Sequence, residues 1–190
     1  MNRLIVILPI LLIFSGCASF KKSGPPPNPT VISPEKLQVR NNAASLLYDL
    51  LSDEKNVSKI LIIKKNRQEL GELIKAISDL ARDGAKQLAQ LAKNDPTLNL
   101  QLLGLPAGEK ATRVAIAKTK EHELLFSSGE NFEFALLLTQ AEALSYGWHL
   151  AKIAGENSTS LEQAHQFSSL SVKLEDLYKQ VVALMRSPPK

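Results

Sequence analysis

The chain has 190 residues and a formal net charge of +4, and 44% of its residues are hydrophobic although only 5% are aromatic. This length suits one domain of ordinary size with additional segments, and the aliphatic composition favours packed helices over a strand-built sandwich. The charge excess is too small to indicate a nucleic-acid-binding protein, so we predict no nucleic-acid partner.

Residues 1–16 have the three parts of an export signal. Arg3 gives a positive start, an apolar run extends from Leu4 to Phe14, and the small pair Ser15-Gly16 precedes Cys17. A helix that crosses a bilayer needs about 20 apolar residues. The run is shorter than that, so we predict a signal peptide rather than a membrane-spanning helix.

The sequence FSGC, which ends at Cys17, resembles the lipobox of bacterial lipoproteins, in which small residues precede the cysteine that follows the signal. Phe14 stands where leucine is usual. The resemblance implies that Cys17 becomes the lipidated N-terminus, held on a membrane by two or three acyl chains such as palmitate. The alternative is an ordinary secretory signal followed by a free thiol.

The residues after Cys17 bear on where the lipoprotein is sorted and how far its body is held from the lipid. The pair Ala18-Ser19 follows the cysteine, so no aspartate stands next to it. By analogy with enterobacterial sorting, this implies attachment to the outer membrane, facing the periplasm. Five prolines in residues 18–34 predict an extended spacer of about 50 Å, at ~3.1 Å per residue. We therefore predict a signal at 1–16, a lipidated cysteine and spacer at 17–34, and a helical domain at 35–187.

From residue 35 onward, apolar residues recur at spacings of three and four, which indicates amphipathic helices. The pattern predicts one helix, straight or kinked, over residues 35–65, which starts at Ser33-Pro34. A second helix ends at Lys93–Pro96. Its predicted buried face consists of Leu70, Leu73, Ile77, Leu80, Gly84, Leu88 and Leu91. Residues 97–108 are predicted to form a long connection, with a short strand as an alternative.

Three more helices are predicted after this connection. The third covers Glu109–Phe126, and the fifth begins near Ser160, a good N-cap with Gln163 three residues later. The predicted buried face of the fourth consists of Phe132, Leu136, Thr139, Ala143, Tyr146, Leu150 and Ile153, and that of the fifth of Leu170, Leu174, Leu177, Val181 and Leu184. The pattern predicts an all-α, antiparallel four- to five-helix bundle.

Helical bundles often hold metals, so the metal-ligating residues need to be tested against this pattern. Di-iron bundles use two Glu-x-x-His pairs and two further glutamates. This chain has one such pair, Glu162 and His165, at the start of the last helix, whereas His122 and His149 have no carboxylate three residues before them. We therefore predict that Glu162 and His165 lie on a solvated helix end, and we predict no metal site and no cofactor.

The sequences SSGENFEFALLLTQAEA at 127–143 and LEDLYKQVVALM at 174–185 resemble an uncharacterised family of exported bacterial proteins with a ferritin-like bundle, a domain of unknown function. The resemblance covers roughly residues 105–185. It implies a ferritin-like fold. Two positions at which those relatives carry histidine hold Leu144 and Leu177 here, so the resemblance implies no inherited catalytic role.

Other chemistries are not indicated. The chain has no Gly-x-Ser-x-Gly elbow and no phosphate-binding glycine-rich loop, and its single cysteine is assigned to the lipid. The cluster Lys64-Lys65-Arg67 is predicted to be a solvated helix face. Tyr146, Trp148 and His149, beside Gly147, either pack on the core or edge a groove for a partner.

We therefore expect a membrane-anchored, non-enzymatic lipoprotein of the cell envelope. Its helical body would bind an unidentified periplasmic or membrane protein or support envelope structure. The alternatives are a ferritin-like metal-binding or redox protein, and a carrier of a hydrophobic small molecule.

Overall fold

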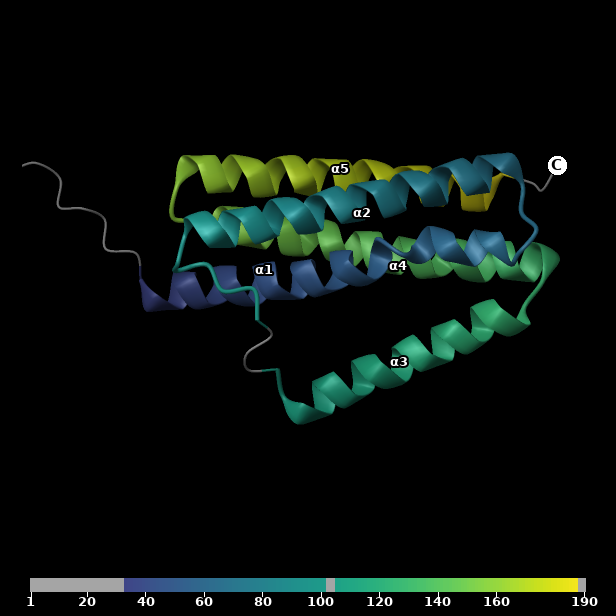
Figure 1. Cartoon of the computed structure of the whole chain (residues 1–190), viewed down its shortest axis with the longest axis horizontal. Coiled ribbons are helices and arrows are strands. Elements are labelled where there is room, and N and C mark those ends of the chain that lie inside the picture. Colours follow the sequence, from purple (N-terminus) through teal and green to yellow (C-terminus); the bar gives the residue numbers. More distant parts are fainter. Residues whose placement is uncertain (1–32, 102–104, 188–190) are drawn as a thin grey trace, which may run out of the picture. The chain divides into compact units, whose positions relative to one another are not determined.

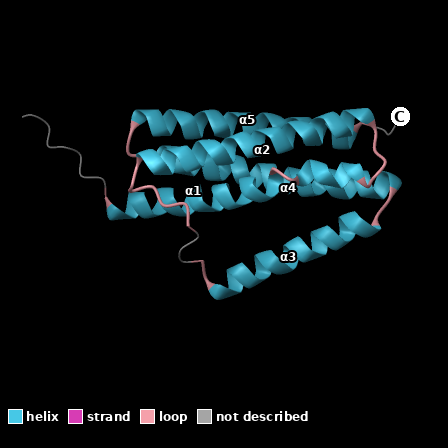
Figure 2. Cartoon of the chain, viewed as in Figure 1, coloured by secondary structure: helices cyan, strands magenta, loops and turns pink. Residues whose placement is uncertain are grey.

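The structure is a computed structural model that describes residues 33–101 and 105–187. The predicted signal, Cys17 and the predicted spacer up to residue 32 lie outside these residues. Among the described residues 84% are helical and no strand occurs (Figure 2). The predicted all-α fold class is confirmed.

The described chain contains five α-helices and one short 3₁₀ helix, η1. In chain order they are α1 (Pro34–Glu54), η1 (Val57–Ile62), α2 (Gln68–Asn94), α3 (Ala107–Phe126), α4 (Gly129–Glu156) and α5 (Leu161–Arg186). Successive α-helices run in opposite directions, so they form an antiparallel bundle (Figure 1). No helix of the described ranges combines the length and the apolar character that crossing a bilayer requires.

The core lies between α1, α2, α4 and α5, which all bury aliphatic side chains. Helix α3 differs because none of its residues is buried, and it lies along the outside of α4 (Figure 1). Polar contacts join the two helices: Arg113 Nη2 donates to the Tyr146 hydroxyl at 2.9 Å, and Lys120 Nζ lies 3.4 Å from a Glu142 carboxylate oxygen. The body is therefore a four-helix core with one helix attached to its surface.

Two predicted helix starts are confirmed by their caps. At the start of α1, the Ser33 hydroxyl accepts a hydrogen bond from the Lys36 N–H at 3.3 Å. At the start of α5, the Ser160 hydroxyl accepts one from the Gln163 N–H at 3.2 Å. Each cap satisfies an N–H group that a helix of itself leaves without a partner.

The prediction of one helix over residues 35–65 is wrong, because α1 ends at Glu54 and η1 follows it. Ser78 of α2 gives a physical reason. Its hydroxyl donates to the Lys55 carbonyl at 2.6 Å, the carbonyl to which the Lys59 N–H would bond in a continued helix. The Lys59 N–H bonds to the Asn56 carbonyl instead, at 3.0 Å, and the chain turns back to begin α2.

The connection between α2 and α3 is a loop, as predicted, and its described residues, 95–101 and 105–106, contain no strand. Leu98 is buried and holds the first half of the loop on the core. Helix α3 begins at Ala107, two residues before the predicted start, and ends at Phe126 as predicted.

The predicted buried face of α4 is wrong in part. Phe132, Leu136 and Leu150 are buried, but Ile153 is 40% exposed. The other buried positions are Leu137, Gln140, Leu144, Gly147, Ala151 and Ala154, in place of Thr139, Ala143 and Tyr146. Small residues face the core because the neighbouring helices lie close: a Cβ on Gly147 would be 3.0 Å from Leu50 of α1. In α5, Leu170, Leu174, Leu177 and Val181 are buried as predicted, whereas Leu184, the last residue of the predicted face, is only partly buried.

A fully buried arginine, Arg40 of α1, joins three segments at the end of the bundle where α1 begins. Its Nη1 lies 3.0 Å from Asp95 Oδ2 and also donates to Thr159 and Gln163, at 3.1 and 3.3 Å. Its Nη2 donates to the Thr97 carbonyl at 2.7 Å. A buried cation of this kind is tolerated only because its N–H groups and its charge are matched.

Asp95 is the counter-charge in this cluster. Burial alone would raise its pKa, but hydrogen bonds from Thr97 and Gln163 and the charge of Arg40 outweigh burial and lower the pKa from 3.8 to about 2. A carboxylate with a lowered pKa in the folded state contributes stability above its unfolded value and loses that contribution as the pH falls through its folded value. The cluster is thus stable at all but strongly acidic pH.

We expect Asp95→Asn to lower the free energy of unfolding by about 3 kcal/mol at neutral pH, because Arg40 then stays buried without a counter-charge. Urea denaturation measures this change. Asp83→Asn, on the exposed surface of α2, should change stability by less than about 0.5 kcal/mol. The gap between wild type and Asp95→Asn should narrow as the pH falls from about 4 to about 2. Equal effects of the two substitutions at neutral pH would contradict the role of Arg40.

A second polar contact in the core joins the end of α1 to α4. Gln140 is buried, and its Nε2 donates to Glu54 Oε2 at 3.0 Å, whereas its Oε1 has no partner among the described residues. Burial raises the pKa of Glu54 to about 6, with a smaller contribution in the same direction from Asp53 and an opposing one from the Gln140 hydrogen bond. A protonated Glu54 could donate to the oxygen of Gln140 that lacks a partner.

This pKa gives a testable pH dependence. A raised folded-state pKa stabilises the protein below the unfolded value, near 4.5, and this contribution is lost as the pH rises through about 6. We therefore expect Glu54→Gln to be more stable than wild type by up to about 2 kcal/mol above pH 7, and to lose this advantage near pH 4.5. Thermal unfolding at both pH values measures the effect, and Asp49→Asn on the exposed side of α1 is the control. A constant difference between wild type and Glu54→Gln at both pH values would count against this titration.

Candidate functional site

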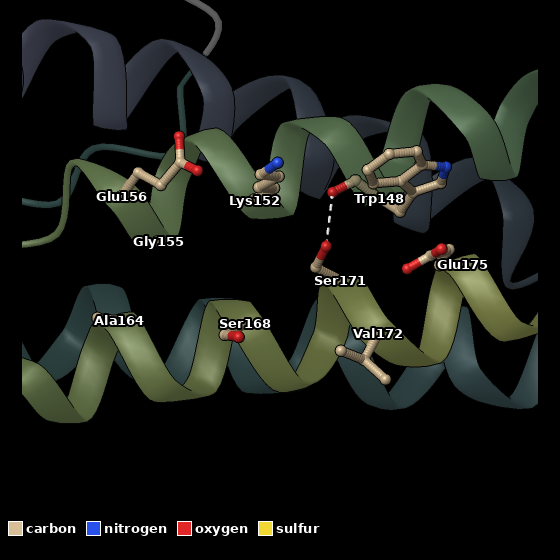
Figure 3. Close-up of a pocket in the computed structure, with 9 residues that line it drawn as sticks. All are labelled: Trp148, Lys152, Gly155, Glu156, Ala164, Ser168, Ser171, Val172 and Glu175. Atoms are coloured by element: carbon tan, nitrogen blue, oxygen red, sulfur yellow. Dashed lines mark hydrogen bonds between the residues drawn. The ribbon is translucent and has the colours of Figure 1, made fainter.

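A groove between α4 and α5 forms a hollow of about 600 Å³ on the described surface (Figure 3). We call it the α4–α5 groove. It is lined by Trp148, Lys152, Gly155 and Glu156 of α4 and by Ala164, Ser168, Ser171, Val172 and Glu175 of α5. The charged side chains of α4 and α5 edge it, and small residues form its centre.

Small side chains produce the hollow. A Cβ on Gly155 would lie 3.3 Å from the Phe167 Cβ and 3.4 Å from the Ala164 carbonyl, so the two helices meet closely here. In the middle of the groove, the Ser171 hydroxyl donates to the Trp148 carbonyl at 2.9 Å (Figure 3). This bond fixes α5 against α4 along the groove.

Trp148 packs against the core, and its indole nitrogen is buried without a hydrogen-bond partner among the described residues. Its ring stacks on His149 with centroids 3.3 Å apart. Of the two arrangements that the sequence left open, Trp148 therefore shows both: it packs on the core and it lines a groove. Because Trp148 is the single tryptophan of the chain, its fluorescence reports on this groove alone.

Tyr146 and His149 line a second, adjacent hollow of about 500 Å³, to which Tyr178 of α5 also contributes. Arg113 of α3 reaches its edge, donating to the Tyr146 hydroxyl and lying 5.1 Å from the centre of its ring. The structure thus divides the predicted aromatic group between two neighbouring hollows. Gly147, beside this group in the sequence, is buried in the core, where its lack of a side chain allows α1 to lie close to α4.

The residues considered as metal ligands do not lie close together. Glu162 and His165 are both exposed on the first turns of α5, as predicted for a solvated helix end, and Glu162 accepts a hydrogen bond from Gln166 at 3.3 Å. His122 is exposed on α3, beside Phe126. The described residues contain no group of three or more His, Cys, Asp or Glu side chains arranged to hold a metal ion.

Leu144 and Leu177, the two positions singled out by the predicted family resemblance, are both buried in the aliphatic core. The surrounding buried face of α4 and α5 carries glutamine and serine as its polar residues and no charged side chain. The core between these two helices therefore serves packing.

The prediction that Lys64, Lys65 and Arg67 form a solvated helix face is wrong. They lie in the connection between η1 and α2. Lys64 Nζ donates to the carbonyls of Leu125 and Ser127, and Arg67 forms an ion pair with Glu133 at 3.0 Å. Of the three, Lys65 is exposed, and Lys64 and Arg67 are half-buried.

Comparison of the chain with protein-family models, with curated proteins and with solved structures found no match. The ferritin-like resemblance therefore stays a prediction. The α4–α5 groove has a centre of small residues, among them Gly155, Ala164, Ser168 and Ser171, and its edges carry both charges, Lys152 on one hand and Glu156 and Glu175 on the other.

The sequence of α5 contains a pattern from which this groove could have been predicted. Ala164, Ser168 and Ser171 repeat at spacings of four and three on α5, which places small residues in a line on one face. Only the position of Gly155 opposite them shows that this line borders a hollow.

We expect Ser171→Ala to lower the free energy of unfolding by about 1 kcal/mol relative to Ser168→Ala, because only the Ser171 hydroxyl bonds to α4. Both variants gain the same helix propensity from alanine, so their difference isolates the hydrogen bond. Urea denaturation followed by Trp148 fluorescence measures both. Indistinguishable midpoints would mean that this bond contributes nothing to the packing of α5 on α4.

Proposed function

We propose that the chain is a membrane-anchored lipoprotein of the bacterial envelope whose helical body binds another envelope component without catalysing a reaction. The observation that carries the proposal is the sequence around Cys17: a positive start, a short apolar run and a small pair before the single cysteine. Lipid on Cys17 would hold the protein on a membrane, and the outer membrane facing the periplasm is the predicted location.

The body supports the binding part of this proposal through the α4–α5 groove. Val172, at the groove, is 53% exposed. Apolar side chains that stay exposed to water at a groove favour association with a partner that covers them. The described lining of the groove offers no cluster of nucleophilic or metal-ligating side chains, which favours a protein or peptide over a chemically transformed substrate.

Metabolic labelling with an alkyne analogue of palmitate tests the anchor. We expect the wild type to incorporate the label, to be released from membranes only by detergent, and to migrate at its processed size. Cys17→Ser should incorporate no label and remain unprocessed, whereas Ser19→Ala, a substitution two residues away, should behave as wild type. A Cys17→Ser protein that is labelled and of mature size would refute the lipobox assignment.

Site-specific photo-crosslinking in intact cells tests the groove. A photoreactive residue at Val172 should give one discrete crosslinked product. The same residue at Val114 on α3, which is 51% exposed, should not give that product. Equal products from both positions, or none from Val172, would remove the groove from the proposal while leaving the anchor unaffected.

A further inference from the structure

Two adjacent isoleucines protrude at the end of the bundle opposite to the start of α1. Ile62 is 83% exposed and Ile63 is 66% exposed, at the end of η1. The two residues before them, Ile60 and Leu61, pack against the core. Ile60 and Leu61 therefore hold η1 on the body, whereas the side chains of Ile62 and Ile63 are exposed to solvent.

The end of α3 is fixed beside these isoleucines. Lys64 Nζ donates to the Leu125 carbonyl at 2.6 Å and to the Ser127 carbonyl at 2.8 Å, so its side chain ties the residues after η1 to the end of α3. Phe126, between these two carbonyls, is 76% exposed. Figure 1 shows the end of α3 at the same end of the bundle as the connection from α1 to α2. Ile62, Ile63 and Phe126 together form what we call the apolar tip.

Positive charge accompanies the isoleucine side of the tip. Residues 55–67 contain four lysines and one arginine and no acidic residue. Lys59 and Lys65 are exposed on either side of the isoleucines. Exposed acidic residues lie nearby as well: Asp53 precedes this segment at the end of α1, and Glu123 and Glu130 belong to the end of α3 and the start of α4, next to Phe126. The isoleucine side therefore combines unshielded apolar surface with cations.

We propose that the apolar tip inserts into the headgroup region of an anionic phospholipid bilayer, with Lys59 and Lys65 against the phosphates. Interfacial binding requires a few apolar side chains that can leave water and nearby cations that can meet anionic lipid. A stable protein interface requires roughly 800 Å² on each partner, or about 20–30 residues a side. Three side chains on a protruding end fit the bilayer surface better than a protein surface.

This proposal does not depend on the proposed lipidation, because it concerns residues of the body. Residues 32–190 form one compact unit that contains the whole described core, so the body can be prepared without the signal and Cys17. Vesicle binding by this body then tests the tip alone, whereas labelling of Cys17 tests the anchor alone.

The experiment is co-sedimentation of residues 32–190 with vesicles of phosphatidylglycerol and phosphatidylcholine, and with vesicles of phosphatidylcholine alone. We expect binding to the anionic vesicles that weakens as salt is added. The double variant Ile62→Ser/Ile63→Ser should bind at least roughly tenfold more weakly. Lys59→Glu/Lys65→Glu should lose a similar factor, and serves as the second variant because it leaves the apolar run intact.

Leu161→Ser is the matched control, since Leu161 is 91% exposed at the opposite end of the bundle. It should bind as wild type does, and circular dichroism should show all variants equally helical. Absence of binding to anionic vesicles, equal binding to both vesicle types, or an equal loss in the Leu161→Ser control would overturn the proposal. A defined complex with an envelope protein through Ile62 and Ile63, without vesicle binding, would assign the tip to a protein instead.

Discussion

The buried guanidinium of Arg40 is the constraint on which the arrangement of the bundle depends. A cation without access to water must have its charge and its N–H groups matched, and here the partners come from the loop after α2 and from the start of α5. The aliphatic core could tolerate small shifts of one helix along another. Arg40 admits only the register in which Asp95, Thr97 and Gln163 converge on it, so it selects one packing among several of similar apolar content.

The number and type of helices were predictable because the spacing of aliphatic residues is regular and the caps at Ser33 and Ser160 are strong local signals. The end of α1 was not predictable, because it depends on Ser78 of α2, which lies twenty residues after Ser58. At the point where α1 ends, the Ser78 hydroxyl donates to the Lys55 carbonyl and accepts from the Ser58 hydroxyl. The buried face of α4 was predictable only in part, because positions 139, 143, 146 and 153 of the predicted face each lie one residue before a buried position, at Gln140, Leu144, Gly147 and Ala154. Close approach of α1 places Gly147 inside and leaves Ile153 at the surface.

The candidate site was less accessible to sequence reasoning than the fold. A line of small residues on one helix is common, and only the facing glycine of another helix makes it a groove. Arg40 could have been noticed, because it lies four residues before Ala44 and seven before Leu47 on the buried face of α1, where a charge is unexpected. Apart from the neighbouring Asn41, however, its partners lie 55 and more residues away and converge only in the folded chain.

The position of the Arg40 cluster also bears on local opening of α1. Arg40 lies six residues after Pro34, within the first two turns of α1. Its contacts reach the loop after α2 and the start of α5. The N-terminal end of α1 can therefore fray past Arg40 only if the hydrogen bonds to both of these segments break, so the start of this helix is tied to two other parts of the body.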